Sequence, residues 1–143
     1  MSSSSSSRGI SLFEILIATL IIGFLTLVAV PPIRQAQQNL RFSSIAHDVR
    51  SELHRVRILS IVRNEDCRLR VTSRSSYLIE CQTPDWQTIG AQHLPHDFEI
   101  SANSAPEFHP RGNVGPMATI RIWNTDGDQK RVIISRSGRV RME

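Results

Sequence analysis

The sequence lacks the residue arrangements that most enzymes and metalloproteins use. It contains no nucleophilic serine motif, no glycine-rich phosphate loop and no paired carboxylates placed for acid–base catalysis. The five histidines are scattered: His47 and His54 are two helical turns apart, and His109 stands alone. No cysteine or carboxylate spacing completes a zinc-binding set around them. We therefore predict that the chain is not an enzyme and holds no metal and no cofactor.

Lysine is also nearly absent. Of the 17 basic side chains only Lys130 is a lysine, and the net charge is +4. Arginine makes bidentate contacts with phosphate better than lysine does, so the composition favours a polyanionic partner. A GC-rich genome would produce the same bias without any binding function, and net charge informs on partners rather than on the fold.

The longest apolar run, Ile15–Ile33, contains no charged residue, and Glu14 stands at its start. An ionised carboxylate in a bilayer costs about 2.5–3.5 kcal/mol, which indicates a function for Glu14. If the chain is cut after Gly9, Ile10 becomes the first residue and Glu14 the fifth. An uncleaved signal anchor over residues 10–33 is the simpler alternative. A cleaved secretory signal is disfavoured, because no A-x-A-like site follows the apolar core.

This arrangement resembles the type IV prepilin family, which includes the pseudopilins of type II secretion. The matching features are a short polar leader ending in Gly9, a cut before a hydrophobic residue, Glu14 at mature position five and Pro31 at mature position twenty-two. The departure is Ile10, where the family usually has phenylalanine. The resemblance implies cleavage between Gly9 and Ile10 by a prepilin peptidase and methylation of the new amine at Ile10. It also implies that Glu14 pairs with the amine of a neighbouring subunit and that Pro31 loosens the helix for filament packing.

The chain divides into a leader (1–9), a transmembrane or filament-core helix (10–33) and a periplasmic head (34–143). Residues 10–63 indicate one long helix, interrupted by Pro31-Pro32 and amphipathic over 34–63. The apolar positions of the amphipathic half recur at helical spacing: Phe42, Ile45, Ala46, Val49, Leu53 and Val56. From residue 66 to 143 the pattern changes to short strands. The predicted fold class is therefore α+β, the pilin fold, with a long N-terminal helix packed on an antiparallel β-sheet.

The chain has only two cysteines, Cys67 and Cys81. An even count in a domain outside the cytoplasm favours a disulfide, with two buried thiols as the alternative. A hairpin turning at residues 73–75 pairs Cys67 with Cys81 and places Arg68 opposite Glu80. It also places Leu69 opposite Ile79 and Val71 opposite Tyr77.

Further strands are expected at 87–94 and 98–102. A second hairpin is expected over 119–124 and 129–135, with residues 126–128 as its loop. That loop would place Ile122 opposite Val132 and Ile120 opposite Ile134.

Basic residues gather near the C-terminus, and Trp123 is the only aromatic close to them, which favours phosphate contacts over base stacking. The closing Gly138-Arg139-Val140-Arg141, the Phe108-x-Pro110-x-Gly112 turn and the strand 120–124 resemble the FimT and GspH branch of the family. In FimT-like members a Gly-Arg-x-Arg tail is associated with DNA binding during natural transformation. The expected DNA-binding residues are Lys130, Arg131, Arg136, Gly138, Arg139 and Arg141, with Arg121 nearby. The alternative is a solvated strand end whose arginines pair with Asp126, Asp128 or Glu143.

The sequence thus predicts a FimT-like minor type IV pilin that binds double-stranded DNA for uptake. It would lie in the inner membrane with its head in the periplasm until it enters a pilus with other pilins. The competing function is that of a structural, GspH-like pseudopilin of type II secretion without DNA binding. An unrelated periplasmic domain on a signal anchor is a third interpretation, which cleavage after Gly9 would exclude.

Overall fold

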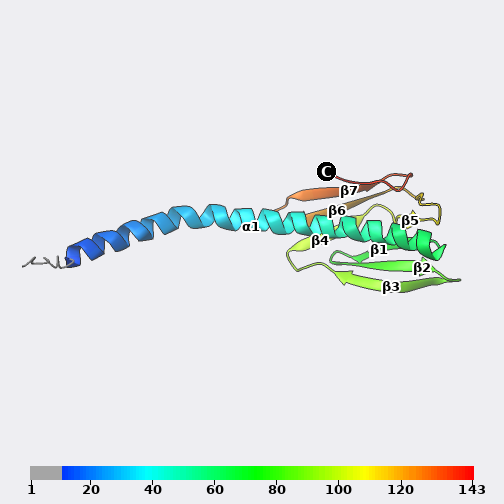
Figure 1. The fold of residues 1–143 in the computed structure, drawn as a ribbon, viewed down its shortest axis with the longest axis horizontal. Helices are drawn as coiled ribbons and strands as arrows, with labels where there is room; N and C mark the ends of the chain where they lie inside the picture. Colours follow the sequence, from blue (N-terminus) through cyan, green and yellow to red (C-terminus); the bar gives the residue numbers. More distant parts are fainter. Residues whose placement is uncertain (1–10) are drawn as a thin grey trace, which may run out of the picture. The chain divides into compact units, whose positions relative to one another are not determined.

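The computed structural model describes residues 11–143, without the side chains of residues 27–34. The predicted cleavage and methylation positions, Gly9 and Ile10, lie outside the described residues. One helix is followed by eight strands (Figure 1). Their bounds are α1 (Leu12–Arg63), β1 (Cys67–Ser73), β2 (Ser76–Gln82), β3 (Trp86–His93), β4 (Phe98–Ala102), β5 (Glu107–Phe108), β6 (Ala118–Asn124), β7 (Gln129–Ile134) and β8 (Val140–Met142). The chain divides into two compact units, of which the first ends at Leu40 and the second, called the head below, is Arg41–Glu143.

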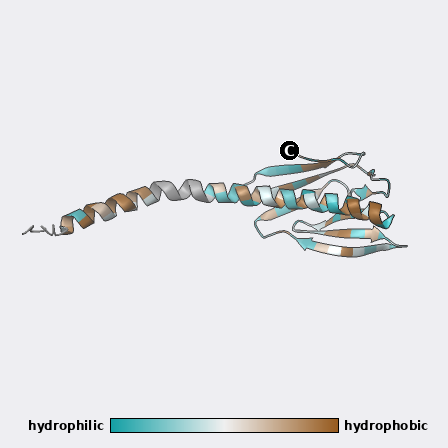
Figure 2. Ribbon diagram, in the orientation of Figure 1, coloured by the Kyte–Doolittle hydropathy of each residue, from teal (hydrophilic) through white to brown (hydrophobic). Residues whose placement is uncertain are grey.

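The first unit contains the beginning of α1. Large apolar side chains of this unit, among them Leu12, Phe13 and Phe24, are exposed. Figure 2 shows hydrophobic, brown segments along this part of the ribbon. Within the part of the chain that the structure describes, no helix is long and apolar enough to cross a membrane. The helix continues through Pro31 and Pro32, so the predicted interruption there is wrong. A helix can run past a proline at the loss of that residue's N–H donor.

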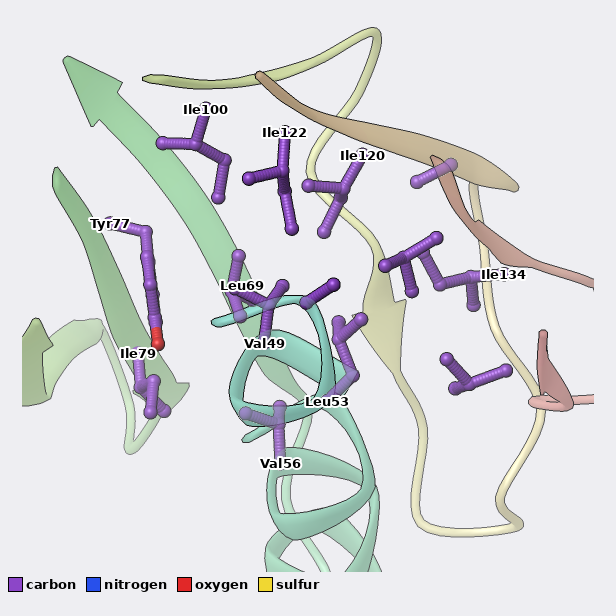
Figure 3. Close-up of a cluster of buried hydrophobic side chains, with 14 of the residues drawn as sticks. Val49, Leu53, Val56, Leu69, Tyr77, Ile79, Ile100, Ile120, Ile122 and Ile134 are labelled. Carbon is purple, nitrogen blue, oxygen red and sulfur yellow. The ribbon is translucent and has the colours of Figure 1, made fainter. Parts of the chain in front are cut away.

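The head consists of two antiparallel sheets and the second part of α1. The strand orders are β3-β2-β1-β5 and β4-β6-β7-β8. Figure 3 shows Val49, Leu53 and Val56 of α1 between residues of both sheets. Leu69, Tyr77 and Ile79 come from the first sheet, and Ile100, Ile120, Ile122 and Ile134 come from the second. These side chains belong to one buried cluster, so the amphipathic face predicted for α1 forms the centre of the core.

The first hairpin confirms the predicted register. Cys67 lies opposite Cys81, Leu69 opposite Ile79 and Val71 opposite Tyr77. The Cys67–Cys81 disulfide is present. The turn is one residue tighter than predicted, because Ser73 pairs with Ser76 after an irregularity in β1.

The second hairpin has a different register from the predicted one. Ile120 lies opposite Val132, and Ile122 lies opposite Lys130. The loop begins one residue earlier, since Asn124 pairs with Asp128: the Asp128 N–H donates to Asn124 Oδ1 at 2.7 Å, and Asn124 Nδ2 donates to Asp128 Oδ2 at 3.1 Å. Gly127, with φ of +89°, supplies the left-handed residue of this turn. A shift of two residues keeps the same face buried, so hydrophobic alternation alone could not detect it.

Candidate nucleic-acid interface

Arg139 and Arg141 lie just before and on β8, the outermost strand of the second sheet. Strand β8 pairs antiparallel with β7, with Val140 opposite Ile134 and Arg141 opposite Ile133. Val140 and Ile134 are buried against the core. Because side chains alternate along a strand, Arg139 and Arg141 point to the outer, solvent-exposed face of the sheet.

The same face carries arginines from two more strands. Arg121 of β6 lies directly opposite Arg131 of β7, and both are exposed. We call the surface formed by Arg121, Arg131, Arg139 and Arg141 the basic face. It is built from three adjacent strands, so its cationic groups have fixed spacing rather than the freedom of a disordered tail.

Little acidic charge opposes the basic face. Arg131 Nη2 lies 3.5 Å from Glu143 Oε2, and both side chains are more than half exposed. An exposed pair of this kind contributes about 0–1 kcal/mol. In the described part of the chain no ion pair joins Arg139 or Arg141 to Asp126 or Asp128. These two arginines are therefore available to an external anion.

A shallow groove runs along this edge of the sheet and encloses about 340 Å³. Its lining consists of Ile133, Ser135, Ser137, Arg139, Arg141 and Glu143. The two serine hydroxyls lie 3.1 Å apart. The guanidinium groups in this groove suit the oxygens of a phosphate, because they donate charge-assisted hydrogen bonds.

Gly138 shapes the turn between β7 and β8. Its φ is +74°, and a Cβ at this position would overlap the carbonyl oxygen of Gly112. Gly138, which the sequence predicted to be among the DNA-binding residues, is buried and not exposed to a ligand. The close neighbours of Gly138 are Gly112 and Arg57 instead.

Arg57 of α1 holds this turn in place, a role that the sequence did not reveal. Arg57 Nη1 donates to the Gly138 carbonyl at 3.1 Å, and Nη2 donates to the Ser137 carbonyl at 3.4 Å. The neighbouring turn is tied by the Val114 N–H, which donates to the Arg136 carbonyl at 2.9 Å. No local pattern distinguishes Arg57 from the other arginines of the helix, because its partners are about 80 residues away.

Two basic residues of the predicted set, Lys130 and Arg136, are not part of the basic face. Lys130 points to the inner side of the sheet, where its Nζ donates to Ser43 Oγ and lies 5.0 Å from the centre of the Phe42 ring. Its position follows from the register, since Lys130 shares a face with the buried Val132. Arg136 is exposed in the β7–β8 turn.

The predicted assembly residues lie on α1. Glu14 is exposed in its first turn. Pro31 lies within the helix, but its side chain is outside the described part of the structure.

Three titratable groups of the head have shifted pKa values, and one of them is Arg70, whose pKa is raised by its hydrogen bond to Glu80 and by the charge of that carboxylate. Burial, with smaller contributions from the carboxylates of Glu52 and Asp48, raises the pKa of Tyr77 to about 12. The hydrogen bond from Arg70 lowers the pKa of Glu80, helped by Arg68 and opposed by burial. These groups belong to β1 and β2 of the first sheet and take no part in the basic face.

His109, which stands alone in the sequence, has close partners in the fold. Its Nδ1 lies 2.8 Å from Asp66 Oδ1. Ligand atoms of Asp66, Glu107 and His109 all lie within 4.8 Å of one another. Sequence spacing could not reveal this cluster, because strand pairing brings its members together.

No protein-family model and no curated protein matches the chain. Solved structures do match it in fold. The minor pseudopilin EpsH from the type 2 secretion system of Vibrio cholerae aligns with a TM-score of 0.63 at 15% identity, over 72% of this chain and 96% of that one. The type IV minor pilin FimU of Pseudomonas aeruginosa aligns with a TM-score of 0.60 at 14% identity, over 74% of this chain and 90% of that one. The chain therefore has the fold of the minor pseudopilins and type IV minor pilins, consistent with the GspH/FimT-type minor pilin expected from its sequence.

Proposed function

We propose that the chain is a FimT-like minor pilin that assembles with other pilins and binds double-stranded DNA through its basic face. A prepilin peptidase cuts it between Gly9 and Ile10, and the new amine at Ile10 is methylated. Residues 10–33 anchor it in the inner membrane before assembly, with Glu14 pairing to the amine of a neighbouring subunit. The protein has no catalytic role.

The arrangement of Arg139 and Arg141 carries the DNA-binding proposal. Both are exposed on one face of a sheet edge, line one groove with serine hydroxyls, and join Arg121 and Arg131 on that face. Duplex DNA presents closely spaced phosphates, and binding releases its counterions in proportion to the phosphates neutralised. Because few groups here are placed to read bases, we expect binding that depends on salt and not on sequence.

The test is DNA binding by fragment 36–143, which carries the head, measured by fluorescence anisotropy over a salt series. The Arg139→Ala/Arg141→Ala variant should bind at least about tenfold more weakly, and its slope of log K against log salt should be shallower by about 2. The matched control is Arg55→Ala/Arg74→Ala, which removes the same charge from exposed arginines elsewhere in the head. The control should retain nearly all of the affinity. Equal losses in both variants would show that net charge, not the basic face, attracts DNA.

A second function, that of a structural pseudopilin without DNA binding, is favoured by a different surface. Near its end α1 exposes Ile58, Ile61 and Val62, which are 60%, 48% and 75% accessible. An apolar strip of this kind suits contact with another protein. A folded head that binds no DNA even at low salt would favour this function.

A further inference from the structure

The pairing of β1 with β5 creates a cluster of possible metal ligands. Cys67 lies opposite Phe108, and both are fully buried. The residues on either side therefore point to the outer face of the sheet. Continuing the register places Asp66 opposite His109, with Glu107 two residues before His109 on the same face.

The three side chains form one compact group. The Asp66–His109 contact is 2.8 Å, and the ligand atoms of all three lie within 4.8 Å of one another. The side chains of Asp66 and His109 are about one-third exposed, and Glu107 is also half-buried. A metal ion would thus have both partial shielding and a path of entry.

Glu107 adds a negative charge that the surrounding cations leave unpaired. The basic residue opposite it is Arg68, but Arg68 is turned towards the other neighbouring strand. Its Nε lies 2.7 Å from Glu80, and its guanidinium lies 3.9 Å from the centre of the Trp86 ring. Among the described residues no ion pair reaches Glu107. Two carboxylates and an imidazole therefore meet, and within the described residues no arginine or lysine forms an ion pair with Glu107.

We propose that Asp66, Glu107 and His109 bind a divalent transition metal, with Zn²⁺ as the best fit. Zinc takes nitrogen and carboxylate oxygen at about 2.0–2.2 Å, and three protein ligands with a water in the fourth position are the set found in catalytic zinc sites. Ligand atoms within 4.8 Å of one another need only small side-chain movements to reach that geometry. Calcium and magnesium prefer all-oxygen ligands, so the imidazole selects against them.

The bound metal would fasten the end of α1 to the loop after β5. The Gly112 N–H donates to the His109 carbonyl at 2.7 Å, and Ser60 Oγ of α1 donates to the same carbonyl at 3.3 Å. The same loop bonds to the turn before β8 through Val114 and Arg136. The metal would therefore cross-link the loops at one end of the head. This inference does not rest on DNA binding.

The experiment uses the full chain in detergent, stripped of metal and free of any histidine tag. Zn²⁺ is titrated by calorimetry, and thermal unfolding is followed with Zn²⁺ and with Mg²⁺. We expect one Zn²⁺ per chain and a higher Tm with Zn²⁺ but not with Mg²⁺. His109→Ala should abolish the effect, and Glu107→Gln should weaken binding at least about tenfold.

Glu107→Gln keeps the Asp66–His109 contact. It therefore tests metal binding even if the His109→Ala variant does not fold. His96→Ala is the matched control, because His96 is an exposed histidine on a different loop. It should bind Zn²⁺ as the unaltered chain does. Two results would overturn the proposal: no change in Tm with Zn²⁺, or equal Zn²⁺ affinity in all three variants. Either would leave Asp66 and His109 as a simple ion pair.

Discussion

The left-handed backbone at Gly138 leads to a quantitative stability prediction. A Cβ there would overlap the Gly112 carbonyl oxygen and lie 2.9 Å from Arg57 Nε. Alanine in this conformation costs about 1–2 kcal/mol, and the steric overlap adds about 1–3 kcal/mol. Alanine also lowers the conformational entropy of the unfolded chain, which offsets this loss of stability by about 0.4–1 kcal/mol. Gly138→Ala should therefore lower the free energy of unfolding by about 1–4.6 kcal/mol.

Gly127 provides the matched control, because it has a similar φ of +89° but nothing within 4 Å of the point that a Cβ would occupy. Gly127→Ala should lower the free energy of unfolding by only about 1 kcal/mol, from the backbone conformation alone. Urea unfolding of fragment 36–143, followed by circular dichroism, measures both. The reasoning is refuted if the two variants are equally stable, since the close approach to Gly112 would then carry no energy.

Three other predictions concern the disulfide, a shifted pKa and the basic face. Replacing Cys67 and Cys81 by serine should lower the free energy of unfolding by about 3 kcal/mol, because the crosslink joins residues 14 apart; a urea midpoint equal to that of the oxidised protein would contradict this. Tyr77 is the only tyrosine, so tyrosinate absorbance reports its pKa directly, and we expect about 12 instead of about 10. The raised pKa means that the folded chain favours the neutral phenol over the ionised one. The stability that this preference contributes is fully present below about pH 10 and is lost as the pH rises through about 12. Ionisation of Tyr77 near pH 10 in the folded chain would contradict the burial. Glu143→Gln should strengthen DNA binding in the anisotropy assay, because it removes the carboxylate beside the basic face; unchanged or weaker binding would show that this carboxylate does not oppose DNA.

The register of the first hairpin could be predicted from the sequence, because the alternating apolar residues and the two cysteines fit only one pairing of the strands. The register of the second hairpin was harder to predict, because shifting one strand by two residues leaves the same side chains buried. Its register is decided by the side chain of Asn124, which bonds to Asp128. Asp128 was expected in the loop, and nothing in the local pattern indicated that Asn124 would close it.

The site was predicted only in part. Arg139 and Arg141 were identified from their residue type and clustering, but which neighbours share their face depends on register. Lys130 was misplaced for that reason, as it faces the helix with Val132. Arg57 and the cluster at His109 depend on contacts between segments about 40 to 80 residues apart, which no local spacing records.

The most direct test of the proposal that this chain is a pilin subunit is the N-terminus of the protein made together with a prepilin peptidase. Intact-mass and peptide mass spectrometry of the membrane-extracted chain identify its first residue and any methyl group. We predict a chain that begins at Ile10 with a methylated amine, and a Gly9→Val variant that keeps the leader. A chain that stays uncut at Gly9 beside an active peptidase would contradict the assignment and favour an unrelated domain on a signal anchor.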